Sequence, residues 1–143
     1  MNIQEQQQNI VKVFSMFDDW TDKYAYLIEL GKELPAIGEK YKDPQHLITG
    51  CQSRVWFHAE MKEDGRIYFT ADSDAVITKG IANLLIKAFS GHTPEEILQA
   101  DTSFLEKIGL KEHLSPTRSN GLLAMIKQIQ LYAKAFQLKQ KSK

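Results

Sequence analysis

The strongest constraint on the fold is a change in the spacing of apolar residues near the middle of the chain. From Ser53 to Met61 apolar side chains alternate with mostly polar ones, which is the period-two pattern of a half-buried β-strand. A second alternating run, from Arg66 to Ala71, follows after Glu63-Asp64-Gly65. Two such runs joined by so short a connection predict a β-hairpin.

The two runs can bring their apolar side chains to one core only in one register. Because successive side chains point to opposite faces, odd-numbered residues must pair with odd-numbered residues. A two-residue Asp-Gly turn would break this rule, whereas a three-residue loop with Gly65 in the left-handed conformation keeps it. The predicted pairs are Met61 with Ile67, Ala59 with Phe69, and Phe57 with Ala71.

Helical spacing of apolar residues precedes the hairpin and follows it. A first helix is predicted over about residues 3–17, and a second after the N-cap Asp19. Ser73 and Asp74 are expected to open a third helix, with the acid in its first turn. Gly80 lies in the middle of that helix, where close packing is the expected reason for a glycine.

The last third of the chain is also predicted to be helical. Thr93-Pro94 marks the start of a short helix through Ala100, because a capping residue followed by proline is typical of a first turn. One or two further helical turns are expected over 103–107. Ser115-Pro116 repeats the signal and starts a long C-terminal helix. The expected fold class is α+β: a single domain, with helices packed on one face of a small antiparallel sheet.

The composition is that of one globular domain over residues 1–143, with the core over about 3–138 and a basic tail at 139–143. Eighteen basic residues balance eighteen acidic ones, so no net charge favours nucleic acid or a membrane surface as partner. No stretch approaches the roughly 20 apolar residues of a membrane span. One cysteine and the absence of a signal-peptide pattern favour a cytoplasmic location.

The single cysteine, Cys51, follows Gly50 and precedes the first predicted strand. One thiol cannot form an internal disulfide, and it supplies only one of the four ligands that a zinc or iron–sulfur site usually needs. Two interpretations remain open: a small buried hydrophobe and a reactive thiol. If the strand extends back to Cys51, the residue shares the face of Val55 and Phe57, and we expect its sulfur to point toward the core.

Motifs for other chemistry are absent. The chain has no glycine-rich phosphate or dinucleotide motif, no HExxH, no CxxC and no closely spaced histidine pair, so neither a metal nor a cofactor is expected. A cysteine hydrolase would need a histidine base beside Cys51, and the nearest, His46 and His58, stand in no local signature.

Arg118 is a second candidate site residue. In the first turn of the C-terminal helix a cation opposes the helix dipole. It is therefore either a plain surface arginine or a cation that serves an anion, such as a thiolate or a persulfide.

Three segments together resemble one known family. Gly50-Cys51-Gln52-Ser53-Arg54-Val55-Trp56 resembles the signature of the SufE family of sulfur acceptors. The segments Asp72–Gly80 and Leu114–Leu122 agree with the same family in order and spacing, as does the early helix segment Leu27–Pro35. The resemblance covers nearly the whole chain, which makes it far more specific than a lone glycine–cysteine pair.

The resemblance implies a role in iron–sulfur cluster assembly. Family members take persulfide sulfur from a SufS-type cysteine desulfurase onto the residue that matches Cys51, stimulate that desulfurase, and pass the sulfur to the SufBCD scaffold. They hold no cofactor and act as carriers and activators without independent turnover. Their cysteine is sheltered beneath a loop tip at rest, so the loop at 47–51 is expected to swing outward on a partner. The residues implied to support the cysteine loop or the docking surface are Gly50, Gln52, Ser53, Asp74 and Arg118.

Two other functions stay open at this level. One is a module that binds and regulates a desulfurase without carrying sulfur, and the more distant one is an independent cysteine enzyme. Trp56, an aromatic residue on the polar face of its strand, is either an anchor for a partner or a residue packed under the C-terminal helix.

Overall fold

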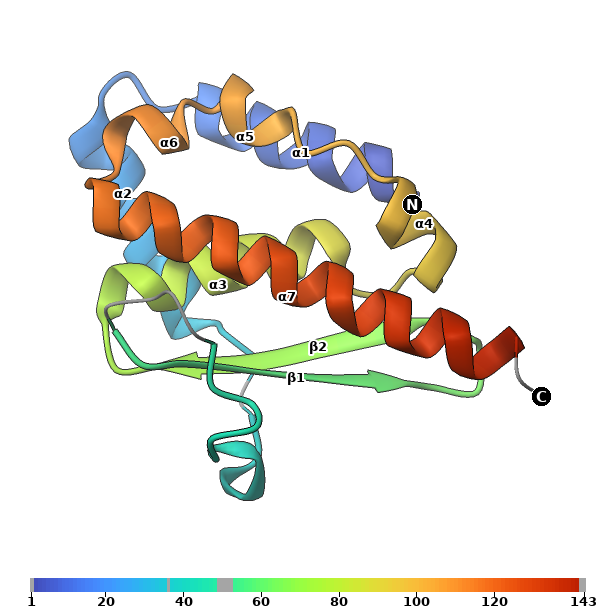
Figure 1. The fold of residues 1–143 in the computed structure, drawn as a ribbon. Coiled ribbons are helices and arrows are strands. Elements are labelled where there is room, and N and C mark those ends of the chain that lie inside the picture. The colour runs from blue at the N-terminus through green and yellow to red at the C-terminus, as the bar shows by residue number, and fades with distance from the viewer. Residues whose placement is uncertain (1, 36, 49–52, 142–143) are drawn as a thin grey trace.

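The computed structural model describes residues 2–35, 37–48 and 53–141 and has the expected α+β architecture (Figure 1). Strands β1 (Val55–Met61) and β2 (Ile67–Ser73) form a two-stranded antiparallel sheet. The helices lie on one face of that sheet, and the long α7 crosses over both strands. The predicted fold class, one domain with helices packed on one face of a small sheet, is therefore confirmed.

The helices agree with the expected order along the chain. Asp19 caps the second helix by accepting a hydrogen bond from the Asp22 amide over 2.9 Å, as predicted. One four-residue helix, α6, was not expected; it follows Gly109 in the left-handed conformation. The bounds of the helices are α1 Ile3–Ser15, α2 Trp20–Lys32, the 3₁₀ turn η1 Glu39–Tyr41, α3 Val76–Phe89, α4 Pro94–Gln99, α5 Phe104–Lys107, α6 Leu110–His113 and α7 Pro116–Lys141.

The hairpin has the predicted register and the predicted loop. Gly65 has a φ of +77°, and the Lys62 amide donates to the Arg66 carbonyl over 3.0 Å on the two sides of the three-residue loop. Odd-numbered residues of both strands face the helices, and most of their side chains are fully buried. The expected pairs Met61–Ile67, Ala59–Phe69 and Phe57–Ala71 are all present.

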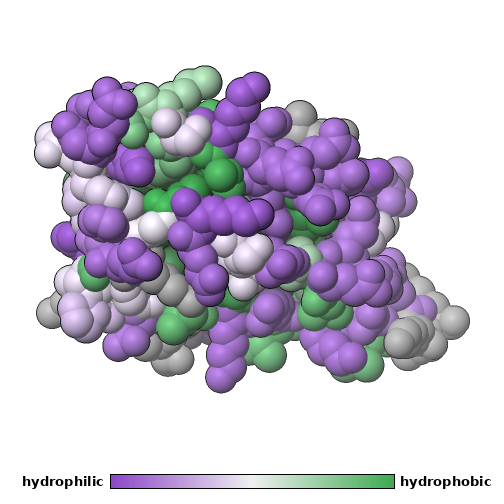
Figure 2. Space-filling view, turned by 90° about the horizontal axis from the view of Figure 1, so that it is seen from above, coloured by the Kyte–Doolittle hydropathy of each residue, from purple (hydrophilic) through white to green (hydrophobic). Residues whose placement is uncertain are grey.

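The outer side of the helical layer faces solvent. Seen from above, most of its surface is hydrophilic, with apolar atoms in limited patches (Figure 2). Among the described residues no helix combines the length and the apolar character that crossing a bilayer requires.

The start of α3 differs from the prediction. The helix begins at Val76 after Ala75, which provides no side-chain cap, and no acid stands in its first turn. Ser73 is instead the last residue of β2, and the carboxylate of Asp74 accepts a hydrogen bond from the Arg54 amide over 3.0 Å. The prediction that these two residues open the helix was wrong, because both side chains bind the backbone of Arg54, the residue just before β1.

The segment between α2 and β1 pairs with the outer edge of β1 and also contacts the face of the sheet opposite the helices. His46 accepts a backbone hydrogen bond from Phe57 over 3.0 Å, and Ile48 donates one to Val55 over 2.8 Å. Trp56 is an even-numbered residue of β1 and lies on this face, with the Lys42 ammonium 5.9 Å from its ring centre, and not under α7. The segment thus pairs with β1 along its outer edge.

Helices α2 and α3 cross in close contact at Gly80. A methyl group built on Gly80 would lie 2.1 Å from the carbonyl oxygen of Leu27, which is far inside the normal contact distance. The side-chain amide of Asn83 donates to the Leu30 carbonyl over 2.6 Å and fixes the same crossing. Close packing is therefore the reason for the glycine, as predicted.

Replacing Gly80 by alanine is expected to destabilise the protein by at least about 1–3 kcal/mol, because the backbone of α2 must move away. Urea denaturation measures the change. Gly38→Ala is the matched control: the built methyl group meets the Tyr41 ring at an ordinary 3.5 Å. We expect that control to change stability by less than about 0.5 kcal/mol. Equal stabilities of the two variants would contradict the close crossing.

His92 joins α1 to the segment before α4. Its side chain is 1% exposed, and its Nε2 lies 2.6 Å from Gln6 Oε1. The amide nitrogen of Gln6 donates to the Lys87 carbonyl, so the Gln6 oxygen accepts and His92 Nε2 carries the proton. Burial lowers the pKa of His92 and outweighs the Glu96 carboxylate, 3.7 Å from Nδ1.

Acid is therefore expected to weaken the fold through His92. Since the pKa of His92 is lower in the folded protein than its unfolded value of about 6.5, the unfolded chain binds more protons just below that pH. The free energy of unfolding should fall as the pH drops from about 7 to about 5. His92→Gln keeps a donor toward Gln6 without a titrating ring and should flatten this dependence. Urea denaturation at several pH values measures it, with the exposed His113→Gln as control; parallel curves for His92→Gln and wild type would contradict the prediction.

Candidate functional site

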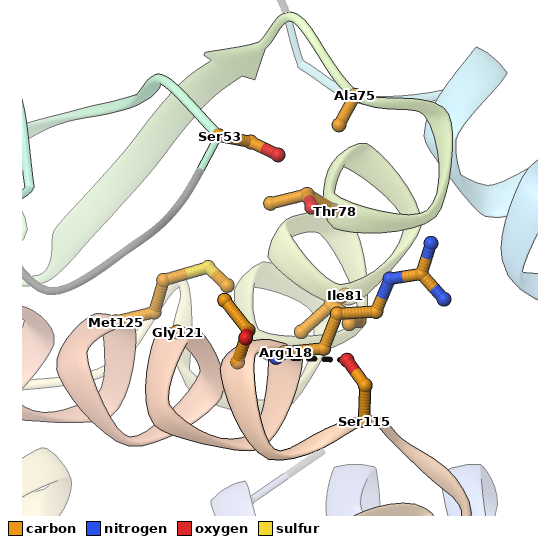
Figure 3. A pocket seen from close by; sticks show the side chains of 9 residues that line it. Ser53, Ala75, Thr78, Ile81, Ser115, Arg118, Gly121 and Met125 are labelled. Atoms are coloured by element: carbon orange, nitrogen blue, oxygen red, sulfur yellow. Dashed lines mark hydrogen bonds between the residues drawn. The ribbon is translucent and has the colours of Figure 1, made fainter.

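A cavity of about 310 Å³ lies where the first turns of α3 and α7 meet the segment that leads into β1 (Figure 3). Its lining is mixed: hydroxyl groups and one guanidinium surround an apolar floor. The residues that line it are Ser53, Ala75, Thr78, Ile81, Ser115, Thr117, Arg118, Gly121 and Met125.

Helical spacing explains why α7 contributes its lining. Arg118, Gly121 and Met125 recur at three and four residues, so they share the face that α7 turns toward α3. Ser115 caps the helix, as predicted, by accepting a hydrogen bond from the Arg118 amide over 3.3 Å. The side chain of Arg118 then extends from the first turn of α7 toward the start of α3.

The electrostatic character of the cavity is positive. Two helices, α3 and α7, begin there, and the backbone amides of a helix start carry partial positive charge. Neither first turn contains an acidic residue that would neutralise it. Thr78, whose side chain is only 8% exposed, adds a hydroxyl group, and Ile81 and Met125 exclude water from the floor. Such a cavity suits an anionic, polarisable group of few atoms.

The chain is fixed on both sides of residues 49–52. Before them, Ile48 donates to the Val55 carbonyl. After them, the Arg54 amide donates to Asp74 Oδ1, and the Arg54 carbonyl accepts from the Ser73 hydroxyl over 2.7 Å and from the Asp74 amide over 3.3 Å. Asp74 therefore holds the backbone that follows the cysteine motif.

The structure brings some of the expected site residues together. Ser53 and Arg118 line the same cavity, whereas Asp74 does not line it but binds Arg54. Gly50, Cys51 and Gln52 lie outside the described residues, and so does the expected direction of the Cys51 sulfur.

Several lining residues had not been anticipated from the sequence. The proline after Ser115 had marked the start of α7 but not its place at a cavity. Ile81 and Met125 stand in no sequence motif that signals a site, and Thr78 carries no such signal of its own. The packing of α3 against α7 brings these lining residues together, and this packing exists only in the folded chain.

Comparison with known proteins identifies the fold and the family. The solution structure of a hypothetical protein from Thermus thermophilus is similar over 93% of this chain and 96% of that one, with a TM-score of 0.77 and 21% identity. At that identity the likeness shows a shared α+β fold, the class to which this cavity-bearing domain belongs. The SufE model, described as an Fe-S metabolism associated domain, matches residues 8–133, and the chain belongs to the SufE family. Membership associates the protein with iron–sulfur metabolism.

Removing the Asp74 carboxylate is expected to free the Arg54 amide. In Asp74→Ala this amide loses its acceptor and should exchange with solvent at least several-fold faster, at a stability cost of at most about 1 kcal/mol. Asp74→Asn keeps an oxygen at the same place and should keep most of the protection. Hydrogen exchange followed by NMR measures both. Unchanged protection of the Arg54 amide in Asp74→Ala would show that the contacts of the Arg54 carbonyl with the Ser73 hydroxyl and the Asp74 amide are sufficient.

Proposed function

We propose that this protein accepts persulfide sulfur from a SufS-type cysteine desulfurase onto Cys51, stimulates that desulfurase, and passes the sulfur to the SufBCD scaffold. The observation that carries the proposal is family membership together with the positive cavity beside the cysteine motif. The protein acts in the reducing cytoplasm as a carrier and activator, with no turnover of its own.

The transfer is a thiol–persulfide exchange. The Cys51 thiolate attacks the terminal sulfur of the desulfurase persulfide, a new sulfur–sulfur bond forms on Cys51, and the bond within the desulfurase persulfide breaks. The desulfurase cysteine leaves as a thiolate and is ready for another round. Because removal of its product frees the desulfurase, acceptance of sulfur also explains stimulation.

The position of the cavity supports storage of sulfur there. Cys51 precedes Ser53 by two residues, and consecutive Cα atoms are about 3.8 Å apart, so the chain keeps the thiol within reach of the cavity that Ser53 lines. A persulfide is acidic and anionic, and two helix starts with Arg118 favour a negative charge. In this proposal Arg118 and Ser53 support the charged sulfur, and Asp74 holds the loop beside it; Gly50 and Gln52 allow the loop to turn outward on the partner.

Replacing Cys51 by serine is expected to abolish sulfur uptake while the fold and desulfurase binding remain. Wild type, incubated with a SufS-type desulfurase and cysteine, should gain the mass of one sulfur atom. Since Cys51 is the only cysteine, a gain that a reductant reverses is assigned to that residue. Intact-mass spectrometry measures the adduct, and desulfurase turnover is recorded in the same samples.

The same measurement separates this carrier from a regulator that carries no sulfur. The regulator would change desulfurase turnover without any adduct on wild type, and Cys51→Ser would stimulate normally. Either result would defeat the proposal. Turnover of a substrate without a partner protein would instead indicate an independent cysteine enzyme.

A further inference from the structure

The outer face of the sheet brings two histidines into contact. His46, from the segment before the cysteine motif, and His58, on β1, are twelve residues apart in the chain. Their ring nitrogens His46 Nε2 and His58 Nδ1 lie 3.2 Å from each other. Tyr41 stacks on the ring of His58, with centres 3.6 Å apart and planes 10° from parallel, so that this ring is held in place.

Each histidine meets a carboxylate through its other ring nitrogen. His46 Nδ1 lies 2.7 Å from Asp43 Oδ1, and His58 Nε2 lies 3.2 Å from Glu60 Oε1. A carboxylate carries no proton at neutral pH and can therefore only accept a hydrogen bond. A nitrogen that faces an ionised carboxylate must carry the ring proton. Both protons of the neutral pair are thereby assigned to the outer nitrogens.

The two inner nitrogens are then left with lone pairs that face each other. Two lone pairs at 3.2 Å repel unless a cation lies between them. Nitrogen ligands bind zinc at about 2.0–2.1 Å, which puts two ligands of one ion about 2.9–3.4 Å apart for angles between octahedral and tetrahedral. The observed separation falls within this range.

We propose that His46 Nε2 and His58 Nδ1 bind one divalent transition-metal ion of the kind that prefers imidazole, with zinc as the probe. Imidazole nitrogens suit zinc, nickel and copper ions. The described residues contain no group of three or more histidine, cysteine or acidic side chains around one point, so water completes the coordination. Both histidine side chains are 17% exposed, which leaves a path for the ion and its waters.

The carboxylates orient the two ligands. A metal-binding histidine commonly donates its other nitrogen to a carboxylate, which fixes the tautomer and raises the basicity of the ligand. Asp43 provides this contact for His46 and Glu60 for His58. The ion would fasten the segment that leads into residues 49–52 to β1. The inference does not depend on the proposed sulfur transfer.

Calorimetric titration of the full chain with zinc at neutral pH tests the site. We expect one ion per chain, loss of this binding in His46→Gln and in His58→Gln, and about 10- to 100-fold weaker binding in Asp43→Asn. His113→Gln, which changes a histidine at the other end of the molecule beside Trp20, is the control and should bind as wild type does. Binding should also persist in Cys51→Ser, which excludes the thiol as the ligand.

Two further measurements keep the test decisive. Zinc should raise the melting temperature of wild type and of His113→Gln but not of the two site variants, whose own unfolding transitions show whether they fold. Nitrogen NMR of the zinc-free protein should place a proton on His46 Nδ1 and on His58 Nε2. Absence of zinc binding by wild type, binding by the His46 and His58 variants as strong as that of wild type, or a proton shared by the two inner nitrogens at about pH 8 would overturn the proposal.

Discussion

The register of β1 with β2 is the constraint on which the rest of the structure depends. With odd residues opposite odd residues, one face of the hairpin is apolar except for Ser73 at its end and can hold the helices. A slip by one residue would turn those side chains to the other face. Gly65, with its positive φ, permits the three-residue loop that sets this register.

The same register determines where the candidate site forms. It places Val55 opposite Ser73, so the residues just outside the sheet, Arg54 and Asp74, are neighbours and bind each other. The chain that follows Cys51 in sequence therefore runs beside the start of α3. Tyr132 of α7 donates to the Phe57 carbonyl over 2.7 Å and fixes α7 across the sheet, with its first turn at the same end of α3. The pairing of β1 with β2 thus accounts for the meeting of the segment before β1, the start of α3 and the start of α7, which together line the cavity.

The fold could be predicted from the sequence wherever a local pattern decided the structure. The alternation of apolar and polar residues predicted the two strands. Prolines after capping residues predicted the starts of α4 and α7, and the glycine in the middle of α3 predicted its close crossing with α2. The prediction was wrong where a contact between residues distant in sequence determined the structure instead of the local pattern. Asp74 has the local pattern of a helix start, yet its carboxylate binds an amide twenty residues away. The cavity lining and the His46–His58 contact depend on packing between separate elements, which periodicity does not encode.

The two helix starts at the cavity lack the acidic residue that would stabilise a first turn. Ala75 gives α3 no side-chain cap, and a cap of the usual kind contributes about 1 kcal/mol. Arg118 puts a cation in the first turn of α7, which costs up to about 1 kcal/mol where an acid would be favourable. Both departures occur at one place, although Ser115 does cap α7, as side chains cap α1, α2 and α4. Acidic residues at the start of α3 or α7 would stabilise the helices but would repel an anionic sulfur in the cavity. The local loss of helix stability therefore agrees with the proposed function, in which the cavity accepts a negatively charged sulfur.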